Sequence, residues 1–143
     1  MNGHILMAFG FGWMVVAALI GLYLGAKHES HLSHLAAAAA SGDLLGYHQV
    51  FDQYRWRVSV HAHGMLFALS SVVVGLVLTR NDAHVVLLGE EALVAVLMFA
   101  TVVWTAAAMW RSRPLMGIAD LAFICALAAT AACVADCHLC VQP

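Results

Sequence analysis

Residues 5–26, ILMAFGFGWMVVAALIGLYLGA, decide the fold class because these 22 residues contain no charged side chain. An α-helix of this length rises about 33 Å, which matches the hydrocarbon core of a bilayer at about 30 Å. The stretch therefore predicts a membrane-spanning helix. It is longer than the apolar region of a signal peptide, roughly 7 to 15 residues, and no Lys or Arg precedes it, so we expect it to be retained.

Three further apolar stretches follow the first one. Short charged turns separate the second from the third and the third from the fourth, which predicts antiparallel hairpins. A polar connection, residues 27–57, separates the first from the second and could hold a short interfacial helix. We predict an all-α, integral membrane bundle of four transmembrane helices forming a single domain, residues 1–143. The predicted spans are residues 5–26, 58–78, 85–109 and 115–134.

The composition supports a membrane location and argues against nucleic acid as a partner. Of 143 residues, 64% are hydrophobic and 10% are charged, more apolar surface than a soluble domain of this size can bury. We therefore expect membrane lipid as a partner, and a multi-pass protein of the bacterial inner membrane. The formal net charge is −2 and no basic patch is evident, which excludes a typical nucleic-acid-binding surface. Small residues in the spans favour close helix packing or a homo-oligomer.

Basic residues near the span ends predict the orientation. An excess of Lys and Arg marks the cytoplasmic side of a membrane protein. Arg80 stands alone on one side, and the excess on the other side places both termini outside. The five residues on that side are Lys27, Arg55, Arg57, Arg111 and Arg113.

The segment RWRVSVHAHGM, residues 55–65, brings two arginines and two histidines to the mouth of the second span. Ionisable groups are costly in a membrane and usually serve a function there. On a helix, His61 and His63 point about 200° apart, so one flat ligand cannot take both from the same face. His61 shares its stripe with Arg57 and with small or flexible residues, at spacings of three, four and seven. Those residues are Gly64, Met65 and Ala68.

This stripe fits a haem. The imidazole of His61 would ligate the iron, while Gly64 and Ala68 would let a flat macrocycle approach the backbone. Arg57 and Arg55 could pair with the propionates at the interface. The alternative is an interfacial histidine bonded to the backbone, with arginines that extend toward the headgroups.

Four short segments resemble the styrene oxide isomerase family. They are GHILM (3–7), the aromatic and basic run into His61 with Gly64 after it, LLG (87–89) and ADLAF (119–123). The resemblance implies a four-span homotrimer that carries haem b. It also implies that His61 is the axial ligand, and that ferric iron acts as a Lewis acid which converts an epoxide to an aldehyde.

Two positions depart from that family. Its asparagine six residues after the axial histidine falls at Phe67, and its catalytic tyrosine on the third span falls at Val103 beside Trp104. Neither Phe67 nor Val103 offers a hydrogen bond to a substrate oxygen. Either the substrate differs, or the chain is a haem-binding relative with another task. We expect Phe67 and Trp104 to line a pocket for an apolar substrate such as an epoxide drawn from the lipid.

Two other functions compete with an isomerase. A transmembrane b-type electron-transfer cytochrome would use His4 and His84 for a second haem, but no second histidine lies within an apolar span on the side of His61. A non-catalytic haem-binding or metal-binding subunit is the other. His28, His31 and His34 could gather Zn²⁺ or Cu²⁺, although their spacing favours a solvated loop. The cluster of Cys133, Cys137, His138 and Cys140 matches no recognised metal or haem pattern and predicts a frayed tail.

Overall fold

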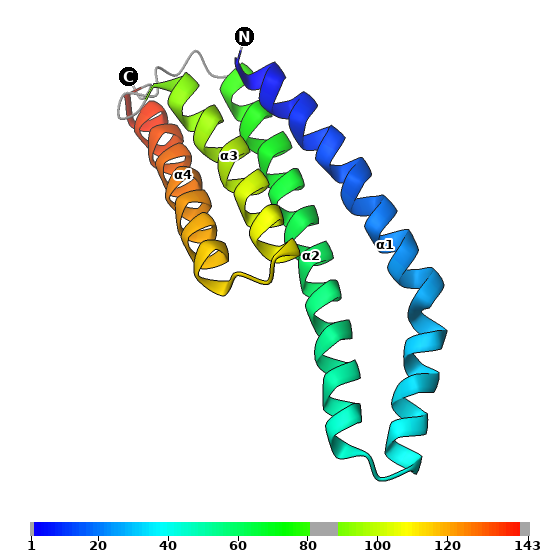
Figure 1. The fold of residues 1–143 in the computed structure, drawn as a ribbon. Helices are drawn as coiled ribbons and strands as arrows, with labels where there is room; N and C mark the ends of the chain where they lie inside the picture. Colours follow the sequence, from blue (N-terminus) through cyan, green and yellow to red (C-terminus); the bar gives the residue numbers. More distant parts are fainter. Residues whose placement is uncertain (1, 81–88, 141–143) are drawn as a thin grey trace.

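A computed structural model describes residues 2–80 and 89–140 of the chain, with side chains as far as residue 132. Four helices account for nearly all of this part, and no strand occurs in it. They are α1 (Asn2–Ala40), α2 (Leu44–Arg80), α3 (Glu90–Met109) and α4 (Arg113–Cys140). Figure 1 shows them side by side as an antiparallel bundle, which confirms the predicted all-α fold.

Each of the four helices is long and apolar enough to cross a membrane. The fold is therefore that of a multi-pass integral membrane protein. The first, second and fourth predicted spans lie inside α1, α2 and α4. The third predicted span coincides with α3 from Glu90 onward, and residues 85–88 lie outside the described residues.

The segment 27–57, expected as a polar connection, is helical except for a turn at residues 41–43. Residues 27–40 continue α1 because they contain neither Gly nor Pro and end in five alanines, the strongest helix former. Gly42 ends α1 with a positive φ of 71°. The carboxylate of Asp43 then accepts a 2.9 Å hydrogen bond from the backbone N–H of Gly46, which caps α2. The result is a helical hairpin that projects beyond the α3–α4 turn (Figure 1).

Glycines bring α1 and α2 into backbone contact along the span. A Cβ at Gly3 would lie 2.7 Å from the carbonyl oxygen of Gly75, and one at Gly10 would lie 2.8 Å from the carbonyl oxygen of Ala68. Membrane helices gain van der Waals contact where small residues allow such close approach. These positions fix how α1 lies on α2.

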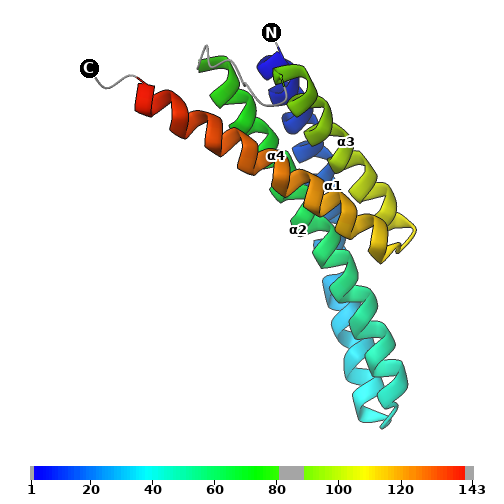
Figure 2. The same cartoon turned by 90° about the vertical axis from the view of Figure 1, so that its left-hand side faces the viewer.

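Aromatic residues from three helices form the centre of the bundle. The ring centroids of Phe67 and Phe123 are 4.3 Å apart, and those of Phe67 and Trp104 are 5.5 Å apart. Large apolar side chains also cover the outside, for example Leu22 and Phe99, which are 72% and 71% exposed. Outward apolar surface of this extent suits contact with lipid. Figure 2 shows that α4 crosses the other helices obliquely.

Candidate functional site

His61 lies halfway along α2, half-buried, with its ring turned toward α1. Its Nδ1 atom is 2.9 Å from the carbonyl oxygen of Ala17. A carbonyl oxygen only accepts hydrogen bonds, so Nδ1 carries the proton and donates it. The second nitrogen, Nε2, then keeps its lone pair. A histidine that binds a metal is commonly held in this way, through a hydrogen bond from its other ring nitrogen.

Gly21 on α1 makes room for this imidazole. A Cβ at position 21 would lie 2.6 Å from Cε1 of His61 and 3.0 Å from Nε2. Any side chain at this position would force the ring to move. Ala17 and Gly21 are one helical turn apart, and together they hold the ring by a hydrogen bond and by contact with the α1 backbone.

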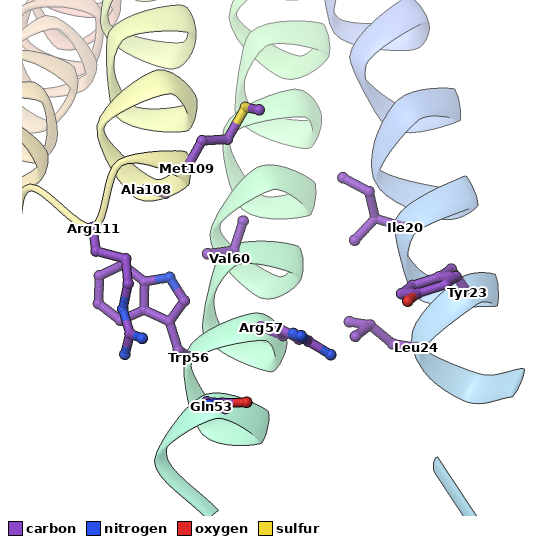
Figure 3. Close-up of a pocket in the computed structure, with 10 residues that line it drawn as sticks. All are labelled: Ile20, Tyr23, Leu24, Gln53, Trp56, Arg57, Val60, Ala108, Met109 and Arg111. Atoms are coloured by element: carbon purple, nitrogen blue, oxygen red, sulfur yellow. The ribbon is translucent and has the colours of Figure 1, made fainter. Parts of the chain in front are cut away.

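A cleft of about 750 Å³ opens next to His61, between α1, α2 and the end of α3. Figure 3 shows Ile20 and Leu24 of α1 facing Val60 of α2 across it. Ile20 and Val60 also line a cavity of only about 20 Å³, and His61 lines the same cavity. The cleft therefore adjoins the small cavity beside the imidazole through Ile20 and Val60, although His61 does not itself line the cleft.

Two arginines border this cleft. Arg57 reaches from α2 toward α1, and Arg111 lies beside Trp56 below the end of α3 (Figure 3). Arg57 also donates a long hydrogen bond of 3.5 Å to Nε2 of His31. Basic groups at the mouth of an apolar cleft could pair with the carboxylates of an amphipathic ligand.

The other residues predicted to hold the cofactor are placed differently. Gly64 lines the small cavity beside His61, and a Cβ there would lie 3.8 Å from the Cβ of Ala17. Ala68 is fully buried, and α1 covers it at Gly10. Within one chain, the space for a flat macrocycle therefore lies toward Arg57 and not over Ala68. Nε2 of His61 lies against the α1 backbone at Gly21, so α1 and the ring would have to move apart for Nε2 to reach a cofactor. Met65, half-buried on the same helix, lines none of the described cavities.

Arg55 lies away from the cleft. It lines a separate groove of about 400 Å³ with Arg111 and Arg113. Arg55 and Arg57 were expected to flank one cofactor, but Arg55 lines the groove and Arg57 lines the cleft.

His63 faces the opposite side of α2, as the helical spacing predicts. Its ring stacks on Trp104 of α3, with centroids 4.9 Å apart and planes 13° apart. Its Nδ1 donates a 2.9 Å hydrogen bond to the carbonyl oxygen of Ser59. This histidine packs between helices, which is a structural role.

Phe67 and Trp104 fill the core, in contrast to the expected pocket lining. They are 3% and 1% exposed, and half-buried Val103 packs against the same cluster. The large cleft has its wall one turn further along α3, at Ala108 and Met109. The indole N–H of Trp104 is buried and has no hydrogen-bond partner.

His28, His31 and His34 lie on α1 and not on the expected loop. His28 hydrogen-bonds through Nδ1 to the hydroxyl of Tyr54 at 2.8 Å, and His31 packs against the same ring with centroids 5.3 Å apart. Within the described side chains, no group of three or more His, Cys, Asp or Glu could hold a metal ion.

The C-terminal cysteines are only partly described. The backbone is helical as far as Cys140. The side chains of Cys133, Cys137 and Cys140 lie outside the described residues. His84 lies there as well, so the pairing of His4 and His84 stays a prediction.

Comparison with protein families, with curated proteins and with solved structures finds no match to this chain. Function therefore has to be inferred from the residues and geometry of the site. His61 and Arg57 remain predictions from the sequence, whereas Ala17 and Gly21, which contact the His61 ring, were not predicted. The signal for the latter pair was the run of small residues on the first span, which marks the face that contacts a neighbouring helix.

Proposed function

We propose that the chain binds one haem b through Nε2 of His61 and isomerises an apolar epoxide to a carbonyl compound. The observation that carries the proposal is the hydrogen bond from Nδ1 of His61 to Ala17, inside a membrane-spanning segment and beside a cleft of about 750 Å³. A ferric haem bound here would supply a Lewis-acidic iron for the epoxide oxygen. The resemblance of four short segments to styrene oxide isomerases supports the same assignment.

Different residues of the chain would orient the iron ligand, bind the propionates and accommodate the substrate. The Ala17 carbonyl orients the His61 ring and makes Nε2 a better electron donor. Arg57 would pair with a propionate at the mouth of the cleft. The apolar wall, with Ile20, Leu24 and Val60, excludes water and suits a substrate that arrives from the lipid.

Polar groups for the substrate oxygen would come from other positions than in the family. Phe67 and Val103 offer none, but Tyr23 and Gln53 both line the cleft (Figure 3). A phenol or an amide can donate a hydrogen bond to an oxygen that gains negative charge. This change of donors favours a substrate that differs in shape from that of the resembling family.

The proposal extends to assembly and location. We expect a homotrimer in the bacterial inner membrane. The outward apolar side chains of the helices would divide between lipid and neighbouring copies.

His61 and His63, two residues apart on α2, provide a matched test of the cofactor. Replacement of His61 by Ala removes the proposed ligand, so the purified protein should lose at least nine-tenths of its haem, measured by the Soret absorption per polypeptide. His63→Ala removes a histidine two residues away that packs on Trp104, and it should keep its haem. A His61→Ala protein with full haem occupancy would reject the ligand assignment.

Spectra and turnover then separate the candidate functions. A five-coordinate ferric spectrum that shifts when an azole or an epoxide is added supports the isomerase, because the iron needs an open position. A six-coordinate spectrum that ignores both ligands supports an electron-transfer cytochrome instead. If the wild-type protein shows no Soret band after expression with added haem, the chain is a non-haem subunit.

A panel of aryl and alkyl epoxides tests the reaction itself. The haem-loaded protein should convert at least one of them to a carbonyl compound. If it converts none, the catalytic half of the proposal fails and the cofactor half stands.

A further inference from the structure

A basic groove lies beside Trp56, where α3 ends and α4 begins. Three arginines from different parts of the chain line it: Arg55 of α2, Arg111 of the α3–α4 turn and Arg113 at the start of α4. The groove has a volume of about 400 Å³ and holds one carboxylate, that of Asp52. Three guanidinium groups against one carboxylate leave a net positive charge in a small space.

These guanidinium groups have few partners of their own. Arg111 lies over the ring of Trp56, 5.3 Å from its centroid, in a cation–π contact. Arg55 and Arg113 form no ion pair with any carboxylate of the residues that the structure describes. Each guanidinium carries five N–H donors in a planar fork that matches carboxylate or phosphate oxygens. The groove therefore presents unused donors to an anion.

The position of the groove points to an amphiphile. It lies at the end of the apolar parts of α3 and α4, beside the indole of Trp56, and tryptophan favours the membrane interface. Further along α4, on the side of the helix that carries Arg113, Leu121 and Ile124 are 62% and 61% exposed. An anion held by the arginines would thus stand above an apolar surface.

We propose that this groove binds the phosphate of an anionic phospholipid, whose acyl chains lie along Leu121 and Ile124. Trp56 and Arg111 line both the groove and the cleft beside His61, but Arg55 and Arg113 line the groove alone, so the groove is an anion site separate from the propionates of a haem. The inference stands on the arginines alone and does not require the proposed haem. Basic residues next to a membrane span attract acidic lipids in the same way.

The test measures lipid bound to the full chain purified in detergent, by native mass spectrometry after addition of phosphatidylglycerol or phosphatidylcholine. Phosphatidylglycerol should bind in preference. Arg113→Gln should lower its retention about tenfold, and Arg113→Lys should restore part of it. Arg80→Gln removes the same charge at the opposite end of α2 and should change nothing. Equal retention by Arg113→Gln and Arg80→Gln would overturn the proposal.

A competition with inorganic phosphate distinguishes the two sources of the anion. If phosphate at the same concentration displaces phosphatidylglycerol completely, the groove binds free phosphate and the lipid assignment is wrong. If phosphatidylglycerol persists, the acyl chains contribute and the assignment holds. Haem content should be unaffected by Arg113→Gln because this residue does not line the cleft. A failure here is thus separable from a failure at His61.

Discussion

At the scale of single residues, the glycine behind His61 decides whether the imidazole can be held as the structure shows. Replacement of Gly21 by Ala would place a Cβ 2.6 Å from Cε1 of His61, so the ring must shift away from Ala17. We expect haem occupancy to fall at least fivefold, measured by a pyridine haemochrome assay on purified protein.

Gly25, one turn later on α1, provides the control for that substitution. A Cβ there meets no atom within 4 Å. Gly25→Ala should keep full occupancy and stabilise the helix by up to about 1 kcal/mol. If Gly21→Ala and Gly25→Ala bind haem equally, the contact between Gly21 and the ring has no role in the site.

The directions of His61 and His63 could be predicted from the sequence, but their contacts could not. Helical geometry alone places the two residues on different faces. Their partners, Ala17 in one case and Trp104 in the other, depend on how α1 and α3 pack against α2. Likewise, Phe67 was expected to contact a substrate, but its ring is buried by packing against Phe123.

At the scale of the helices, the contact between α1 and α2 depends on small residues at fixed positions. Gly10→Leu would drive a side chain into the carbonyl oxygen of Ala68, 2.8 Å from the position of its Cβ. Overpacking of this kind costs about 1–3 kcal/mol, so thermal unfolding in detergent should begin at a lower temperature.

Gly12 lies on the same helix with open space around it. Gly12→Leu should therefore leave the unfolding temperature nearly unchanged. A drop of equal size in both variants would mean that leucine disturbs α1 itself and not its contact with α2.

The number and type of the helices followed from the apolar stretches, whereas the length of α1 and α2 did not. Their polar ends were interpreted as a connection because hydropathy ignores helix propensity, which the alanines 36–40 provide. The contact face of α1 was not predicted, although Gly3, Gly10 and Ala17 recur every seven residues and all three are buried. A seven-residue repeat of small residues is typical of two helices packed along their length.

At the scale of the whole molecule, charge sets the orientation in the membrane. The basic groups gather at the end of the bundle where α3 ends, with Arg80 alone at the other end. From the cytoplasmic preference of Lys and Arg we expect the turn 41–43 inside the cell and both ends of the bundle's chain outside. A protease site inserted between Ser41 and Gly42 should be cut in inside-out vesicles and protected in right-side-out vesicles. The opposite pattern would reverse the orientation.

The helical hairpin formed by the ends of α1 and α2 has a practical consequence. With 39 residues, α1 is about 58 Å long, nearly twice the hydrocarbon thickness. With the start of α2, the excess length forms a helical hairpin with a three-residue tip, which we expect to extend beyond the headgroups. A compact soluble protein grafted at that tip would be carried at a defined height and angle. Such a graft would give single-particle imaging a landmark for a chain that is otherwise too small to align.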